Sequence, residues 1–422
     1  MNGAWKWRVV AGVLPALLLG GSFAAAAESG SVWPRSGNTV DVLASAPAYQ
    51  AAWRAVGAEE SVHRQYLIGP HEWTGTVSAA RRTQSSPTPE RSTEWEVGLE
   101  RALRLPGKSE AFDRAGQARV AQARAAAHKV WREQARLLLE RQGTWLRERE
   151  SARVWAVQVG LFQQQLETVA KRQRLGDAAR IEQEQAEAAL VQAQAQAQAA
   201  SGRATAARTG LERLFPGIDL APDAALPAPQ GLEQTDAQWI AAQLEAHPEL
   251  ELARAESATA ETQSKLDAAE TRADPTLGLR YGRARNGAEN LLGVVLSIPI
   301  GGDYRAAGAA AAASRSAAAA LRRVDAELHA QADAAQRLHE ARTAYTFWQG
   351  SADAAQRLAR AADSLQRGYQ LGSGNLGDVL SARRLANEQQ LSAAGAAVDA
   401  WVSQHRLELE ANRLWAEPSA RR

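Results

Sequence analysis

The sequence contains no cysteine, and Met1 is its only methionine. Without cysteine the chain cannot form disulfides, thiolate metal sites or a cysteine nucleophile. Lysine plus arginine number 49 and aspartate plus glutamate 47, with no basic tract, so nothing indicates a nucleic-acid partner. The seven histidines are scattered, and no arrangement of His, Asp and Ser recurs. We therefore expect no enzyme, no cofactor and no metal site.

Proline is missing from two long stretches, 107–215 and 300–417. Because proline breaks a helix interior, each stretch predicts a very long helix followed by a last helix. Apolar residues also recur every seven positions, which is typical of coiled-coil packing. These series are Trp131, Leu138, Trp145; Trp155, Phe162, Val169; Leu321, Leu328, Ala335; Leu338, Tyr345, Ala352; and Leu358, Leu365.

Short segments of alternating polarity precede each long helix and predict two β-hairpins. The expected strands are 71–82 and 93–105, then 275–284 and 290–300, and the second turn is Asn286-Gly287. The apolar side of each alternation comprises Trp95, Val97, Leu99, Leu292, Val294, Leu296 and Ile298. Strands of about ten residues with one apolar side match outer-membrane β-structure. We expect these side chains to face lipid, with Leu296 near mid-membrane; a soluble sandwich is the alternative.

Four strands are too few to close a membrane barrel, and an open sheet is not stable in lipid because the backbone N–H and C=O groups along its edges would have no hydrogen-bond partners. Copies of the chain must therefore share one barrel, and cyclic symmetry is the simplest arrangement. The predicted fold class is mainly α with a small β part: a coiled-coil helical tunnel plus two hairpins per chain.

The N-terminus has the pattern of an export signal. Lys6 and Arg8 precede an apolar run from Val9 to about Phe23 and an alanine-rich exit, which predicts cleavage after Ala27. The alternative is an uncleaved membrane anchor. No later segment approaches the ~20 apolar residues of a membrane-spanning helix.

The chain also repeats itself. Residues 95–112 align with 290–307, and 174–190 align with 370–386, which indicates two halves of about 200 residues. Each half reads as a helix (40–66 or 236–272), a hairpin, a long helix, a glycine break and a last helix. The predicted organisation is a signal peptide at 1–27, a first repeat at 28–214 with its hairpin at 71–105, a Pro-rich linker at 215–232, a second repeat at 233–416 with its hairpin at 275–300, and a tail at 417–422.

This organisation, together with the element "YQLGSGNLGDVLSA" at 369–382, resembles the TolC family of outer-membrane efflux channels. The phrases "HPELELARAE", "DPTLGLRYG" and "LRLPGK" resemble its cobalt–zinc–cadmium and nickel resistance branch. The resemblance implies a homotrimer in the outer membrane of a Gram-negative bacterium, with a twelve-stranded barrel above a twelve-helix periplasmic tunnel. It also implies a periplasmic adaptor, an inner-membrane proton-driven pump, contact with outer-membrane lipid, and export of heavy-metal cations.

The resemblance places a cation-attracting acid at the channel entrance on Asp378, whose counterpart in the first half is Glu182. A second acid three residues on is replaced by Ser381, and a basic latch residue is replaced by Gly374. Asp378 can equally be a first-turn carboxylate that stabilises the start of a helix. Gly176, Gly372 and Gly374 are expected in the turns of the periplasmic tip. Two other functions remain open: a periplasmic adaptor or coiled-coil scaffold, and a drug or secretion channel of the same family.

Overall fold

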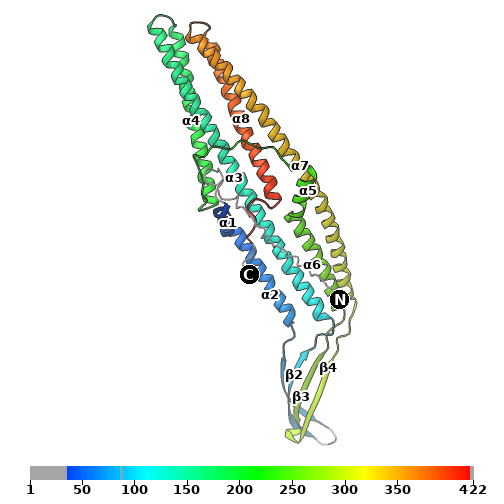
Figure 1. The fold of residues 1–422 in the computed structure, drawn as a ribbon. Coiled ribbons are helices and arrows are strands. Elements are labelled where there is room, and N and C mark those ends of the chain that lie inside the picture. The colour runs from blue at the N-terminus through cyan, green and yellow to red at the C-terminus, as the bar shows by residue number, and fades with distance from the viewer. Residues whose placement is uncertain (1–35, 86, 88, 419–422) are drawn as a thin grey trace, which may run out of the picture.

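The computed structural model describes residues 36–85, 87 and 89–418, so the predicted signal peptide and residues 419–422 of the predicted tail lie outside the described residues. Long helices form an elongated body, and a four-stranded sheet projects from one end (Figure 1). The architecture confirms the predicted fold class. In chain order the elements are α1 (Ser36–Ser45), α2 (Pro47–Ile68), β1 (Thr74–Gln84), β2 (Glu90–Ala102), α3 (Lys108–Arg174), α4 (Arg180–Leu214), α5 (Asp236–Glu245), α6 (Pro248–Glu270), β3 (Thr276–Ala284), the 3₁₀ turn η2 (Arg285–Gly287), β4 (Glu289–Ser297), α7 (Asp303–Gln370) and α8 (Leu376–Glu410).

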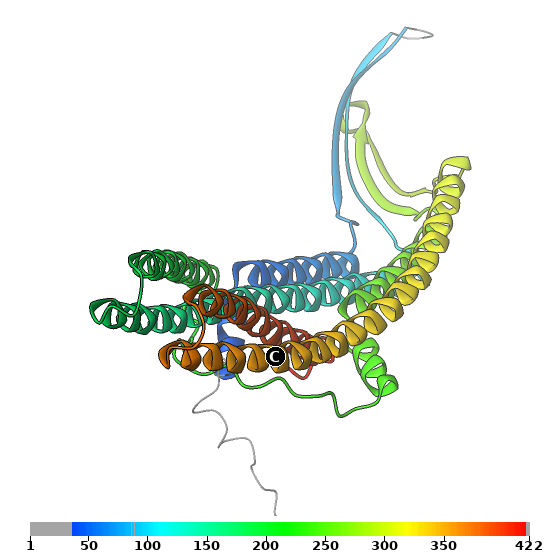
Figure 2. The same ribbon diagram turned by 90° about the horizontal axis from the view of Figure 1, so that it is seen from above.

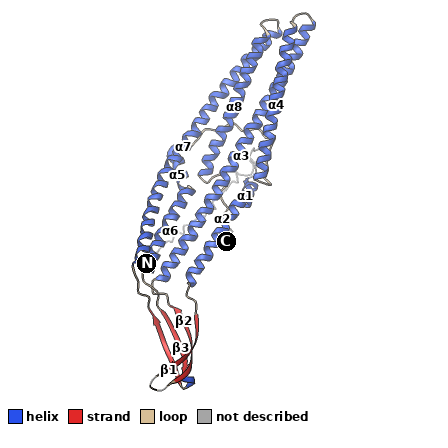
Figure 3. Cartoon of the chain, turned by 180° about the vertical axis from the view of Figure 1, so that it is seen from behind, coloured by secondary structure: helices blue, strands red, loops and turns tan. Residues whose placement is uncertain are grey.

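The two proline-free stretches form the predicted long helices. Helices α3 and α7 have 67 and 68 residues, and each extends about 100 Å at 1.5 Å per residue. Each folds back through a short turn onto a 35-residue helix, α4 or α8, at the end of the molecule opposite the sheet (Figure 3). The two halves therefore share one order of elements, and Figure 2 shows the two hairpins side by side beyond the helices.

The helix that opens each half is broken, although the sequence predicted it to be continuous. A break at Ala46 separates α1 from α2, and a break at Ala246 and His247 separates α5 from α6. In both places the next residue is a proline at the first helical position, Pro47 or Pro248. The proline ring disfavours helical backbone in the residue before it, so the preceding helix ends there. The prediction of one continuous helix in each half was wrong for this reason.

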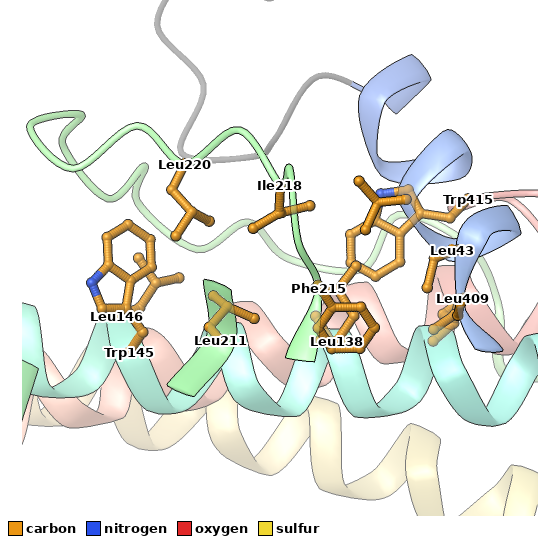
Figure 4. Packing of buried hydrophobic residues seen from close by; sticks show 14 of the residues in the cluster. Leu43, Leu138, Trp145, Leu146, Leu211, Phe215, Ile218, Leu220, Leu409 and Trp415 are labelled. Atoms are coloured by element: carbon orange, nitrogen blue, oxygen red, sulfur yellow. The ribbon is translucent and has the colours of Figure 1, made fainter. Parts of the chain in front are cut away.

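The largest hydrophobic cluster lies midway along the helices. Trp131, Leu138 and Leu146 on α3 are at most 2% exposed and lie in one cluster with residues of α1, α4 and the end of α8 (Figure 4). The Pro-rich segment predicted as a linker adds Ile218 and Leu220 to this cluster. Arg149 of α3 donates to the carbonyl oxygen of Pro222 at 3.2 Å. The segment is therefore packed against the helices rather than spanning open solvent.

The heptad series behave differently in the two halves. In α3, Trp131 and Leu138 are buried because α2, α4, α6 and α8 surround the helix. In α7, Leu321 and Leu328 are 72% and 61% exposed, because α5, α6 and α8 leave that side of α7 uncovered. The series Leu321, Leu328 and Ala335 thus has no partner within the described part of the chain, whereas Leu338 of the next predicted series is buried in a cluster with Trp239 of α5.

A buried ionic network holds three helices together below this cluster. Arg136 of α3 donates to Glu410 of α8 through Nε and Nη2, both at 2.7 Å, and to Glu249 of α6 through Nη1 at 2.6 Å. Burial opposes ionisation of Glu410, which is 2% exposed, but the hydrogen bonds and charge of Arg136 outweigh burial and lower its pKa. The pKa of Glu249 is lowered by the same balance.

This network predicts acid sensitivity. A carboxyl whose pKa is lowered by folding adds stability above its unfolded-state pKa, here about 4.5, and loses it as the pH falls through the lower folded value. We expect the melting temperature to drop as the pH falls below about 4.5. Glu410→Gln should cost about 3–5 kcal/mol at neutral pH, because Arg136 loses a buried partner. Thermal unfolding followed by circular dichroism between pH 3 and 7 measures both effects.

Glu388→Gln is the matched control, since Glu388 is exposed on the same helix. Its melting curve should follow that of the wild type at every pH. An equal loss in both variants at neutral pH would contradict the role assigned to the network.

Candidate functional site: the helix tips and the four-stranded sheet

The glycines singled out in the sequence lie in the two turns of the helical tip. Gly176, Gly372 and Gly374 have φ of 84°, 87° and 97°, left-handed conformations that glycine adopts without a Cβ clash. In both turns a backbone N–H bonds back to a carbonyl five residues earlier, Asp177 to Arg172 and Ser373 to Gly368, each at 2.8 Å. This is the Schellman pattern of a helix C-terminus. The two turns are therefore built alike, as the repeat predicts.

Asp378 lies in the first turn of α8, exposed at the tip. Its backbone N–H donates to Asn375 Oδ1 at 2.9 Å, and its carboxylate accepts from Asn375 Nδ2 at 2.7 Å. The reciprocal pair is a form of capping box and satisfies a free N–H of the helix start. The side chain thus has the helix-stabilising contact that the sequence offered as one of its two roles.

A second contact at the tip, a side-chain hydrogen bond called here the tip tie, joins the two repeats and was not identified in the sequence. The hydroxyl of buried Tyr369 donates to Glu182 Oε2 at 2.6 Å. Arg172 donates to the Tyr369 carbonyl at 2.9 Å and stacks its guanidinium 4.4 Å from the ring centroid. Burial, followed by the hydrogen bond to Glu182, raises the pKa of Tyr369 to about 12, so the hydroxyl remains a donor at neutral pH. The only sequence feature that pointed to this contact was the equivalence of Glu182 to Asp378 in the two repeats, which places Glu182 at the same tip.

The sheet at the other end has the order β1-β2-β3-β4, all antiparallel. Both strands of the first hairpin extend further toward their loop than predicted, but they are shorter at the helix end, where 71–73 and 103–105 lie outside the strands. Part of the expected loop between the strands is paired, because Arg82, Thr83 and Gln84 pair with Ser92, Arg91 and Glu90. Strand β4 ends at Ser297, so Ile298 lies just past the sheet and is 63% exposed.

The register brings the predicted lipid-facing residues of the strands together. Residues directly opposite in an antiparallel sheet lie on one face. Leu99, Leu279 and Val294 form one such row. The complete face, called here the apolar face, carries Gly75, Val77, Ala79, Arg81, Thr83, Arg91, Thr93, Trp95, Val97, Leu99, Arg101, Leu277, Leu279, Tyr281, Arg283, Asn290, Leu292, Val294 and Leu296.

The opposite face, called the polar face, holds every acidic residue of the four strands. These are Glu90, Glu94, Glu96, Glu100 and Glu289, against only Arg82 and Arg280 as bases. Glycines also crowd this face: a Cβ at Gly282 would lie 2.9 Å from the Trp95 carbonyl oxygen. A hollow of about 140 Å³ opens there beside Glu94 and Glu96. All acidic side chains of the strands thus lie on one face of the sheet and most of the large apolar side chains on the other, with Leu291 and Val295 as apolar exceptions on the polar face.

Polar contacts fix the sheet to the helices. Lys108, at the start of α3, donates from Nζ to Asp274 Oδ1 at 2.8 Å, and the Leu105 N–H donates to the same atom at 3.0 Å. Arg101, at the helix end of the apolar face, donates to the His71 carbonyl at 2.9 Å, and its guanidinium lies 5.5 Å from the Trp73 ring centroid. These contacts set the direction in which the hairpins leave the helices.

Metal ligands and membrane-spanning helices were both sought in the structure. Within the described part of the chain, no group of three or more histidine, aspartate or glutamate side chains is placed to hold a metal ion. None of the described helices combines the length and apolar character that crossing a bilayer requires.

Comparison with known proteins gives the same architecture. The chain has the fold of outer-membrane channels. It superimposes on the outer-membrane channel OprN with a TM-score of 0.68, at 17% identity over 91% of each chain. A structure of CusC, described in terms of folding and transmembrane channel formation, gives 0.67 at 14% identity over 91% of this chain and 92% of that one. The outer membrane protein VceC of Vibrio cholerae gives 0.64 at 17% identity, over 91% and 97% of the two chains.

The likeness is one of fold alone, since the identities are low. No family model matches the sequence, and no curated protein matches it.

The tip tie predicts a local effect. Tyr369→Phe keeps the ring under Arg172 but removes the hydroxyl that donates to Glu182. The free energy needed to open the tip locally should therefore fall by about 1.5–3 kcal/mol. Amide hydrogen exchange should become faster in 176–186 and 366–380. Tyr345→Phe, also on α7 but remote from the tip, removes the hydroxyl that accepts from Gln349 and should leave tip exchange unchanged. Unaltered tip exchange in Tyr369→Phe would refute the tie.

Proposed function

We propose that this chain is one subunit of a homotrimeric outer-membrane efflux channel of the TolC family, whose helices form a periplasmic tunnel. The observation that carries the proposal is the separation across the sheet: apolar side chains on one face, all strand acids on the other. A channel wall needs this division, because one face meets lipid and the other meets water. The helical tip then lies in the periplasm, within reach of an adaptor and an inner-membrane proton-driven pump.

Two unpaired surfaces support assembly with copies of the chain. Strands β1 and β4 are the open edges of the sheet, and such edges are not tolerated in lipid. Pairing β1 of one copy with β4 of the next closes a ring. The uncovered stripe of α7, with Leu321 and Leu328, lies on the same chain and gains cover from a neighbouring subunit. A scaffold or adaptor role explains the helices but not the apolar sheet.

The apolar face has the height of a membrane barrel. From the row of Arg101 to the row of Arg81 is about 26 Å along the strand, or about 20 Å after a tilt of ~40°. Snorkelling arginines at both ends extend this toward the ~25 Å apolar band of such barrels. Leu296 shares the row of Arg101, so the middle of the band falls at the row of Val97, Tyr281 and Leu292, with Val294 one row away, rather than at Leu296 as expected from the sequence.

The charge distribution favours cations as the exported species. Five glutamates and two arginines per chain line the polar face, so the lumen of a closed barrel is strongly negative. Asp378 adds a carboxylate at the opposite mouth. Together with the resemblance to the cobalt–zinc–cadmium and nickel branch, this points to heavy-metal cations. A drug or secretion channel of the same fold needs no such bias.

The barrel assignment predicts different outcomes at two adjacent valines. Val294→Arg places a charge on the lipid face near mid-membrane and should cost about 2–4 kcal/mol, lowering the yield of assembled trimer. Val295→Arg is the matched control, because it points to the polar face in the row of Glu100 and should spare assembly. Trimer on non-heated gels of outer-membrane fractions is the measurement. Equal losses in both variants would contradict the assignment of faces.

The entrance assignment is tested at Asp378. Three carboxylates around one axis concentrate negative potential in a narrow mouth. Asp378→Asn should reduce cation preference and block by trivalent cations in planar-bilayer recordings, with trimer yield unchanged. Asp353→Asn, remote from the tip on α7, controls for loss of a surface charge. A lower melting temperature with unchanged selectivity would leave Asp378 with its capping role alone.

A further inference from the structure

Arginines end the apolar face at the tip of the hairpins. Arg283 lies in the row of Trp95, and Arg81 lies in the next row, opposite Thr93. Arg91 follows one row further, opposite Thr83. Successive rows on one face are about 7 Å apart. The three side chains therefore form an ascending series over the last rows of the apolar face, and all three are exposed.

These arginines lack the carboxylate partners that the arginines of the polar face and of the turn have. On the polar face Arg82 pairs with Glu94 at 2.9 Å and Arg280 lies 3.7 Å from Glu96. Arg285, at the turn, pairs with Glu289 at 2.9 Å.

By contrast, no described carboxylate lies within 4 Å of Arg81, Arg91 or Arg283, and Arg283 has only the Asn290 Oδ1 contact at 3.0 Å. The two residues of the hairpin loop that the structure does not describe are serine and threonine, so neither supplies an acid.

Closing the barrel does not supply a partner either. Every acidic side chain of the strands lies on the polar face, and a neighbouring copy brings the same strands with the same register. The positive charges of Arg81, Arg91 and Arg283 therefore remain uncompensated by the described residues at the hairpin end of the apolar face, whereas Arg101 at the helix end donates to the His71 carbonyl. An anion from the surroundings must balance them.

The neighbouring residues indicate where that anion comes from. Trp95 lies in the row of Arg283, and its ring meets that of Tyr281, one row nearer the helices, edge to face at 5.8 Å. Tryptophan is enriched at the level where acyl chains give way to head groups, which places that level at the row of Trp95 and Arg283. Guanidinium groups bind phosphate through paired, charge-assisted hydrogen bonds. A phosphate carried by a lipid lies at this height, whereas a soluble anion has no reason to collect beside an apolar face.

We propose that Arg81, Arg91 and Arg283 form a binding surface for the phosphate groups of outer-leaflet lipid. The surface rests on the proposed function, since it requires the apolar face to meet the membrane. Three subunits present three such surfaces around the outer rim, and each ties the barrel to its lipid annulus at a fixed height.

The test uses the full chain, purified as the assembled species in a non-ionic detergent. The protein is titrated with lipid A bearing two phosphates, with its monophosphoryl form and with a dephosphorylated form, and bound lipid is counted by native mass spectrometry. The variant Arg81→Gln/Arg91→Gln/Arg283→Gln is compared with a matched triple variant of the paired arginines, Arg82→Gln/Arg280→Gln/Arg285→Gln.

Wild type should bind the diphosphoryl lipid most tightly. The first variant should lose on the order of 100-fold in affinity for it, since each of the three arginines at a charged membrane surface contributes about a factor of five. The matched variant should keep its affinity. Equal losses in the two variants, or equal binding of the three lipids by wild type, would overturn the proposal.

Two further measurements complete the test. The first distinguishes lipid phosphate from free phosphate, and the second distinguishes failure of this binding surface from failure of the proposed channel function. Inorganic phosphate at the same phosphate concentration should not displace the lipid; complete displacement would make the surface a free-phosphate site and overturn the lipid assignment. Assembled trimer that binds all lipids equally leaves the channel function standing while this surface fails. Protein that neither assembles nor retains any lipid, dephosphorylated lipid included, refutes the proposed function itself.

Discussion

Unpaired backbone along the edges of β1 and β4 is the constraint on which the other features depend. A four-stranded sheet with one apolar face is stable neither in water, where the apolar face is exposed, nor in lipid, where its edges are unsatisfied. Only pairing with further strands removes both costs. In the proposed channel the open edges make the oligomer a condition of folding rather than a later association, and the neighbouring copy also covers the hydrophobic stripe that α7 leaves exposed within one chain.

The two halves use the same elements for different purposes. In the first half α3 is enclosed by four helices and carries the central core with Trp131 and Leu138. In the second half α7 leaves Leu321 and Leu328 exposed, while Leu338 is buried in a cluster with Trp239 of α5. In the proposed trimer the first repeat supplies the interior of the subunit, and the exposed side of α7 supplies a contact surface. The Arg136 network and the Tyr369–Glu182 contact join the halves at two heights, near the core and at the tip.

Much of the fold was predictable from the sequence because it depends on local rules. Absence of proline together with the glycine breaks at Gly176 and Gly372 predicted α3 and α7, and alternation predicted which strand residues share a face. The helix breaks at Pro47 and Pro248 were also local and could have been predicted from the prolines. The Arg172–Tyr369 contact could not be found this way, because it joins residues from different halves whose approach depends on how the helical hairpins pack. The grouping of all strand acids on one face, across all four strands, was known only from the register.

The pairing of β2 with β3 has a consequence for how the protein is made. Leu99 lies opposite Leu279, so the central ladder of the sheet joins segments about 180 residues apart in the chain, and closing so large a loop is slow. During synthesis the first hairpin exists long before its partner, with its apolar face and the inner edge of β2 both exposed. The same hairpin is therefore an aggregation hazard until the second repeat arrives, and its arginines and glutamates act in that interval as solubilising charges before they take their places in the finished sheet.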